Sequence, residues 1–322
     1  MSMESLSRAE FLKLLALGGA GIALFGGPEQ ALAALARADE DLDRAALDGG
    51  AHAAHAAGTI LAVAKGSSAS TNVKKAIAAI GGMRKFVQAG DVVVVKPNIG
   101  WARAPKYAAT TNPTVVGTIV SLARGAGAKK VIVMDNPVSA DPGSCYRGSG
   151  IAAAVKAAGG SMQVMGGSGF KSYAIPGHLL KNHPLYAAIV NANVLINVPI
   201  AKVHGSTGLT LSGKNLMGCT NNRTRMHTLG LSQSIAEINA KLRPELTVLD
   251  AMHILVRNGP SGGSLGDVVT KNTVLACRDW VAADTWACRL FGKQPGAVPY
   301  IKAAANMGLG TMNLSSIVIK TV

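Results

Sequence analysis

An apolar strand, a helix and a second apolar strand follow one another directly, and this succession constrains the fold of the chain most. Residues 91–95 (DVVVV) and 131–134 (VIVM) are apolar runs, and the segment from Pro113 to Gly125 between them places apolar residues at helical spacing. Such short runs indicate strands buried on both faces, and a helix between two strands indicates a parallel pair. This unit predicts an α/β fold with a mainly parallel central sheet and helices on both of its faces.

Polar residues follow each of the predicted strands. Lys96 and Asn98 come directly after the first strand, and Asp135 comes after the second. A later apolar run, residues 246–249, ends in Asp250. The carboxyl ends of parallel strands lie at one edge of the sheet, where α/β proteins bind their ligands. We therefore expect these side chains to face a common cleft, in which Lys96 and Asn98 bind a ligand.

One glycine-rich stretch, residues 197–220 (NVPIAKVHGSTGLTLSGKNLMGCT), turns from apolar to polar directly after a third predicted strand. It holds Lys202, His204, Lys214 and Asn215 between glycines, which allow a ligand to approach the main chain closely. We predict that Lys202, Lys214 and Asn215 bind a phosphate or carboxylate group. A buried Lys214 is alternatively a base or an imine-forming amine. A plain surface loop is the other interpretation of the stretch.

The polar residues define two open classes of function. An enzyme would use Lys214, His204 and Asp250 as its catalytic residues, and Arg225 and His227 would complete a clamp around an anionic ligand. The alternative is a non-catalytic binding protein or a self-assembling structural protein of the cell envelope. The sequence names neither a substrate nor a reaction.

A divalent metal is a further prediction for the same cleft. Asp135, Asp250 and His204 are its expected ligands, because carboxylates and imidazole bind such ions. The alternative role of the two aspartates is helix capping, and that of His204 is a structural hydrogen bond. Other cofactors stay open.

The composition is basic and apolar. The net charge is +15 and apolar residues make up 48% of the 322 residues, which is enough for a sizeable core. The excess of positive charge predicts attraction to anionic partners. The chain has no run of lysine and arginine, so the predicted partner is a small anionic ligand rather than nucleic acid. The Ala- and Gly-rich, aromatic-poor composition is compatible with a homo-oligomer.

The N-terminal residues have the pattern of an export signal. Residues 1–38 contain a short apolar stretch after Arg8 and Lys13, followed by small residues. The segment resembles a twin-arginine signal, although Ala9 replaces the second arginine. We predict a signal over 1–38, a tail over 39–60, and an α/β core over 61–322 with an irregular insertion at about 138–185. The protein is expected to be periplasmic or extracellular, with membrane contact only through its N-terminal segment.

The four cysteines give no metal-cluster pattern. None of them belongs to a C-x-x-C motif, so no iron–sulfur cluster is expected. In an exported protein Cys277 and Cys288 form either a disulfide or two buried thiols.

From Leu61 onward the chain resembles an uncharacterised family, the domain of unknown function numbered 362. The motifs that carry the resemblance are Val-Val-Lys96-Pro97-Asn98, Thr111-Asn112-Pro113, Asn197-Val-Pro with Lys202-x-His204, Ser212-Gly-Lys214-Asn215-Leu-Met-Gly218, Arg225-x-His227, Leu249-Asp250-Ala251, and Asp279 with Asp284. The resemblance implies an α/β fold, and export in some members. Some members also carry an iron–sulfur module, but this chain has no matching set of cysteines.

A weaker likeness is to the lactate racemase group. There, a lysine in a glycine-rich loop holds a nickel-pincer cofactor, and Lys214 is the only candidate for that lysine here. This likeness implies a similar fold and no shared chemistry.

Overall fold

The computed structural model describes residues 58–139 and 141–322. The predicted signal (1–38) and nearly all of the predicted tail (39–60) lie outside the described residues. Export therefore stays a prediction of the sequence.

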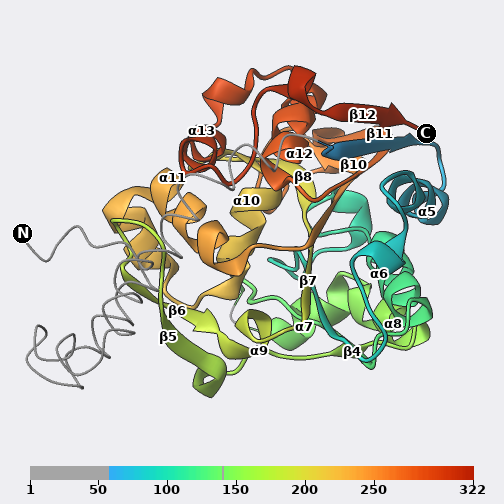
Figure 1. The fold of residues 1–322 in the computed structure, drawn as a ribbon, viewed down its shortest axis with the longest axis horizontal. Helices are drawn as coiled ribbons and strands as arrows, with labels where there is room; N and C mark the ends of the chain where they lie inside the picture. Colours follow the sequence, from blue (N-terminus) through green and yellow to red (C-terminus); the bar gives the residue numbers. More distant parts are fainter. Residues whose placement is uncertain (1–57, 140) are drawn as a thin grey trace, which may run out of the picture. The chain divides into compact units, whose positions relative to one another are not determined.

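The described chain alternates strands and helices (Figure 1). The strands are β1 Ile60–Lys65, β2 Val92–Pro97, β3 Lys130–Val133, β4 Ser161–Met162, β5 Phe170–Ala174, β6 Asn182–Tyr186, β7 Val194–Val198, β8 Ile200–His204, β9 Gly208–Thr210, β10 Leu246–Leu255, β11 Val268–Cys277 and β12 Val318–Thr321. The α-helices are α5 Ala69–Ala79, α6 Pro113–Gly125, α7 Pro142–Gly148, α8 Ile151–Ala157, α9 Ala187–Val190, α10 Ser212–Asn215, α11 Arg223–Leu242, α12 Trp280–Ala287 and α13 Pro299–Asn306.

One large sheet organises these elements, with the strand order β12-β1-β11-β10-β7-β2-β3-β4. The pairs from β10 through β7, β2 and β3 to β4 are all parallel, whereas β11 runs antiparallel to both of its neighbours. Strand β8 pairs in parallel with β10 and carries the short antiparallel strand β9. The prediction of an α/β fold with a mainly parallel sheet is confirmed.

The predicted strand–helix–strand unit is β2–α6–β3. Val93 of β2 lies opposite Val194 of β7 on one side and Val131 of β3 on the other, so β2 is a central strand. Helix α6 begins at Pro113, and the side chain of Asn112 caps it by accepting a hydrogen bond from Thr114 N at 2.9 Å. The polar residues after β2 and β3 therefore meet at one edge of the sheet.

Each face of the sheet supports its own hydrophobic core. Val93 and Val95 pack with α5, α6 and α8, whereas Val94, which points to the opposite face, packs with α11, α12 and α13. Figure 1 shows these two groups of helices on opposite sides of the sheet. Because both faces of β2 are covered, its sequence is a continuous apolar run rather than an alternating one.

Residues 138–185, expected to be an irregular insertion, hold more regular structure. Helices α7 and α8 lead into the short strand β4, which pairs in parallel with β3 and extends the main sheet. The rest forms most of a separate antiparallel hairpin, β5–β6. Helix α7 begins after Asp141 with Pro142 in its first turn, and Gly150, in the left-handed conformation, separates it from α8.

Strand β10 is longer than expected. The sequence suggested a strand that stops at Asp250, but β10 continues to Leu255 because it pairs along this length with β11. Asp250 therefore lies inside a strand and not at its end.

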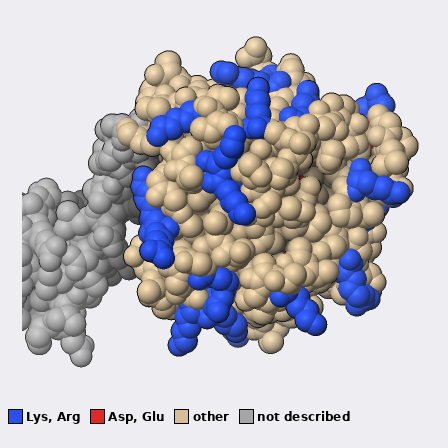
Figure 2. Space-filling model, turned by 90° about the vertical axis from the view of Figure 1, so that its right-hand side faces the viewer, with Lys and Arg blue, Asp and Glu red and all other residues tan. Residues whose placement is uncertain are grey.

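The outer surface is cationic. Among the described residues, the buried acidic side chains are Asp135, Glu237, Asp250, Asp267, Asp279 and Asp284. The acidic side chains of the described residues with more exposure are Asp91, Asp141 and Glu245. Figure 2 shows lysines and arginines spread over one face with almost no acidic atoms between them. The described part of the protein therefore attracts anions from solution.

Within residues 58–139 and 141–322, no helix combines the length and the apolarity needed to cross a membrane. All four cysteines are buried, and each is a free thiol, Cys277 and Cys288 included.

Candidate functional site

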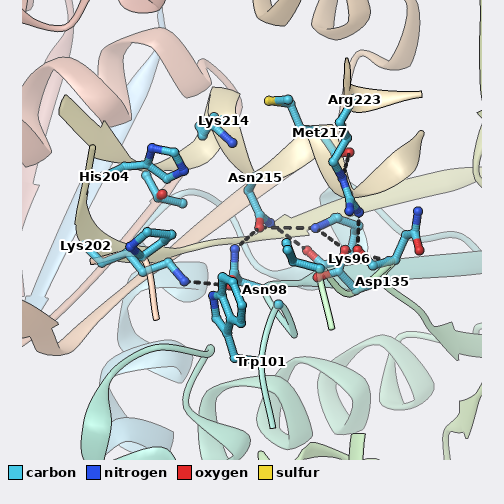
Figure 3. Close-up of a pocket in the computed structure, with 16 residues that line it drawn as sticks. Lys96, Asn98, Trp101, Asp135, Lys202, His204, Lys214, Asn215, Met217 and Arg223 are labelled. Carbon is cyan, nitrogen blue, oxygen red and sulfur yellow. Dashed lines mark hydrogen bonds and ion pairs between the residues drawn. The ribbon is translucent and has the colours of Figure 1, made fainter. Parts of the chain in front are cut away.

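A cavity opens at the carboxyl ends of β2 and β3. It holds about 470 Å³ of empty space, its open mouth included, and residues of the segments 96–101, 135–138 and 202–218 line it together with Arg223 and Pro260. Figure 3 shows the side chains of Lys96, Asn98, Lys202, Lys214 and Arg223 arranged around it. The predicted meeting of β2, β3 and the glycine-rich stretch thus forms one concave site.

The floor of the cavity is a buried ion pair. Lys96 Nζ lies 2.7 Å from Asp135 Oδ1, and the two side chains are 1% and 3% exposed. Asp135 also accepts hydrogen bonds from the backbone N–H groups of Ile99, at 2.7 Å, and Asn136, at 2.9 Å. Lys96 Nζ also donates to Pro97 O at 2.8 Å. The charge of Asp135 is therefore used inside the protein and is not available to a ligand.

Gly218 leaves room for this ion pair. A Cβ atom at this position would lie 2.0 Å from Asp135 Oδ1 and 2.6 Å from Lys96 Nζ. Real Cβ atoms do not approach so closely, so the backbone of the glycine-rich stretch can cross the pair only at a glycine.

Two asparagines connect the strands to the stretch above them. Asn98 Nδ2 donates to Asn215 Oδ1 at 3.0 Å, and Asn215 Nδ2 donates to Asn197 Oδ1 at 2.8 Å. Lys202 Nζ donates to Asn98 Oδ1 at 3.1 Å and to Ala109 O at 2.5 Å (Figure 3). This network fixes the amide and ammonium groups that border the cavity.

The short helix α10 presents Lys214 to the cavity. The carboxylate of Asp284 accepts hydrogen bonds from Ser212 N at 2.8 Å and Gly213 N at 3.0 Å, which fixes the start of the helix. A Cβ at Gly213 would lie 2.4 Å from the Trp280 ring, so α10 packs tightly on α12. The two buried residues Asp284 and Trp280 thus set the direction in which Lys214 leaves the backbone.

Lys214 has a depressed pKa. Burial, and to a lesser extent the positive charges of Arg223 and Lys96, together lower the pKa of its ammonium group to about 8. Its Nζ forms no hydrogen bond or ion pair within the described residues, and Figure 3 draws no interaction to it.

Two neighbours of Lys214 are also shifted toward their neutral forms. Burial, followed by the charge of Lys214, lowers the pKa of Lys202 to about 7 and that of His204 to about 4. The Nδ1 atom of His204 accepts a hydrogen bond from Ser206 N at 3.1 Å, so its ring proton resides on Nε2. In all three groups burial is the main cause of the shift, and the neighbouring positive charges add to it.

Some of the site residues were not predicted from the sequence. Arg223 lies at the start of α11 and donates through Nε to Met217 O at 3.3 Å and through Nη1 to Pro137 O at 3.3 Å. Its Nη2 also donates to the carbonyl of Asn136, another residue that lines the cavity. The position of Arg223, just after the glycine-rich stretch, is the signal that could have identified it.

Other predicted residues do not line the cavity. Asp250 is 1% exposed and accepts hydrogen bonds from Asn112 N at 2.7 Å and Met252 N at 3.0 Å, so it holds the start of α6 against β10. Arg225 donates to Leu180 O at 3.3 Å, and neither Arg225 nor His227 is among the residues that line the cavity. His227 nevertheless lies near it, because burial and then the charge of Lys214 lower the pKa of its ring.

The predicted metal set is not assembled. Asp135 and His204 line the cavity, but Asp250 does not, and Asp135 is paired with Lys96. Among the residues that the structure describes, no three His, Cys, Asp or Glu side chains gather in a group suited to a metal ion.

Replacing Lys214 with methionine should stabilise the protein at neutral pH. The pKa shift from 10.5 to about 8 corresponds to a gain of about 1–3 kcal/mol in the free energy of unfolding, because methionine keeps the apolar stem without the charge. In the unfolded chain the lysine keeps its ordinary pKa of 10.5, so between pH 8 and 10.5 the unfolded state binds more protons than the folded state. The free energy of unfolding of the parent therefore increases as the pH rises through this range. Urea unfolding at pH 7 and pH 10 should therefore show a smaller advantage of the variant at pH 10. A variant less stable than the parent at pH 7 would mean that the ammonium group is paired.

Comparison with known proteins gives one family. Residues 93–289, more than half of the chain, match the model of the family described as Domain of unknown function (DUF362). The match begins in β2 and ends just after α12, and so includes every segment that lines the cavity.

One relative is similar to part of this chain in sequence, and two solved structures are similar to part of it in fold. The thylakoid-associated protein sll1697 of Synechocystis sp. is 26% identical over 239 residues, which are 71% of this chain and 72% of that protein. The lactate racemase apoprotein from Thermoanaerobacterium thermosaccharolyticum aligns with 71% of this chain and 56% of its own, at 12% identity and a TM-score of 0.45. A structural-genomics protein from Thermotoga maritima aligns with 71% of this chain and 60% of its own, at 10% identity and a TM-score of 0.44. The chain spans less than two thirds of each of these two solved proteins.

Proposed function

The chain belongs to the DUF362 family, and we propose that it binds a small anionic ligand, bearing a carboxylate or a phosphate, in the cavity beside Lys214. The observation that carries this proposal is the balance of charge. Lys96, Lys202, Lys214 and Arg223 line the cavity, and the carboxylate of Asp135 is the one acidic group among its lining residues, all of which are described. That carboxylate is paired with Lys96, so an anion would compensate the charges that are left.

The size of the cavity limits the ligand to a small molecule. Its volume of about 470 Å³ includes the mouth, so the part enclosed by protein is smaller. The described part of the protein carries far more cationic than acidic side chains on its surface, which would attract anions from solution. Trp101 and Met217 add apolar walls, which would contact the uncharged part of a ligand.

The convergence of the predicted residues favours a ligand site over self-assembly. Lys96, His204 and Lys214 lie around one cavity, whereas a surface used only for assembly would leave them scattered. Asp250 is absent from the cavity lining, so a Lys/His/Asp catalytic set does not carry the proposal.

Calorimetric titration of the full chain with phosphate, acetate, pyruvate and succinate at pH 7 tests the proposal. At least one of these anions should bind, and Lys214→Met should weaken that binding at least about tenfold, or about 1.4 kcal/mol. The matched control is Lys129→Met, which removes an exposed lysine away from the cavity and should leave the affinity unchanged. Equal binding by the parent and Lys214→Met would place the anion elsewhere.

A further inference from the structure

Lys214 differs from the other cations around the cavity in what its nitrogen contacts. Lys96 Nζ is paired with Asp135 at 2.7 Å, and Lys202 Nζ donates to Asn98 and Ala109. The guanidinium of Arg223 donates to three backbone carbonyls. The ammonium of Lys214 has no such acceptor among the described residues, although it borders the same cavity. A deprotonated Lys214 would thus have a lone pair that is directed at no protein group.

The surroundings of Lys214 favour the neutral amine. Burial and the nearby charges of Arg223 and Lys96 lower its pKa to about 8, so about a tenth of the molecules carry a neutral amine at pH 7. Lys202 has a still lower pKa of about 7, but its nitrogen is held by two oxygen acceptors. Geometry therefore selects Lys214 as the nucleophile and Lys202 as a fixed neighbour.

The cavity also provides what a carbonyl substrate with a negative charge needs. The guanidinium of Arg223 lies around the same space as the amine and suits a carboxylate next to the carbonyl carbon, and the nitrogen of Lys202 borders that space as well. His204 lines the cavity as a neutral imidazole whose ring proton is on Nε2. That N–H is a hydrogen-bond donor for the oxygen that leaves the carbonyl carbon.

We propose that Lys214 condenses with the carbonyl group of a small 2-oxo acid to form an imine. This proposal rests on the anion site proposed above. The lone pair of the Lys214 amine attacks the carbonyl carbon, a C–N bond forms, and the carbonyl π electrons move to oxygen, which takes a proton from the nitrogen. The C–O bond of this carbinolamine then breaks, and the oxygen leaves as water with the second proton of the amine while the C=N bond forms. One amine and one carbonyl thus give one imine and one water, with no oxidant or reductant.

Reductive trapping tests the proposal on the full chain. The protein is incubated with pyruvate and sodium cyanoborohydride, which between pH 6 and pH 8 reduces an imine to a stable secondary amine but not the free ketone, and the modified lysine is located by peptide mass spectrometry. We expect one modified residue, Lys214, and a labelling rate that rises between pH 6 and pH 8, because the neutral amine is the nucleophile. Lys214→Arg keeps the positive charge and removes the nucleophile, so it should lose at least about nine tenths of the label.

The control and the contradicting outcomes separate this proposal from the anion site. Lys129→Met should be labelled at Lys214 like the parent. Pyruvate that binds by calorimetry but leaves Lys214 unlabelled would overturn the imine and leave the anion site standing. Label spread over surface lysines, or fixed on Lys202, would also overturn it. Absence of anion binding by the parent would overturn the site itself and the imine with it.

Discussion

Asp135→Asn should lower the free energy of unfolding by about 3–5 kcal/mol, the cost of leaving one member of a buried ion pair without its partner. Lys96 is 1% exposed and would keep its charge next to an uncharged amide. The nearby positive charges of Lys202, Lys214 and Arg223 could not compensate it. Asparagine has nearly the same shape as aspartate, so the loss would come from charge rather than from packing. Urea unfolding followed by circular dichroism measures it.

Two further variants separate the pair from other effects. Lys96→Met/Asp135→Asn removes both charges and should recover much of the lost stability, since no unpaired charge remains buried. Asp141→Asn removes a carboxylate that is exposed to solvent. It should therefore change the unfolding midpoint much less than Asp135→Asn does. An unfolding free energy of Asp135→Asn equal to that of the parent would mean that the pair does not stabilise the fold.

The sequence predicted the parts of the site that depend on strand direction. Lys96, Asn98 and Asp135 were expected together because two parallel strands end at the same edge, and they line one cavity. What the pattern could not show was the partner of Asp135. Pairing with Lys96 at 2.7 Å depends on side-chain positions across two strands, and it replaces the predicted metal contact.

Helix geometry explains why Arg223 borders the cavity and Arg225 does not. Helix α11 begins at Arg223 because the side chain of Asn222 caps it, and Gly230 interrupts the regular helix further on. Residues two apart on a helix point about 200° away from each other. Arg223 therefore contacts Met217 and Asn136 while Arg225 contacts Leu180.

Asp250 was misplaced for a different reason. A strand that meets an aspartate after an apolar run resembles a strand end, but β10 continues because the next strand, β11, pairs with it antiparallel as far as Leu255. The carboxylate is instead satisfied by two backbone N–H groups, which is a structural role. Burial raises the pKa of Asp250 to about 6, as expected for a carboxyl group enclosed without a cation.

Val93→Asp should cost about 4 kcal/mol or more and leave little folded protein, because it places a charge without a partner in the most enclosed layer of the molecule. Val93 is 0% exposed, lies between β7 and β3 and packs against the core under α5 and α6. Urea unfolding of any soluble fraction measures the loss. Where too little protein folds, Val93→Ala provides a milder test, with an expected loss of about 2 kcal/mol from the cavity it leaves.

The edge of the same sheet provides the matched control for Val93→Asp. Val318 lies on the edge strand β12 and is 51% exposed, so the charge of Val318→Asp stays in water. Its unfolding midpoint should remain close to that of the parent, whereas that of Val93→Asp or Val93→Ala should fall. Equal midpoints for the variants at 93 and 318 would mean that β2 is not enclosed on both faces. The ends of β2 and β3 would then have no fixed support, and the cavity that depends on Lys96 and Asp135 could not be maintained.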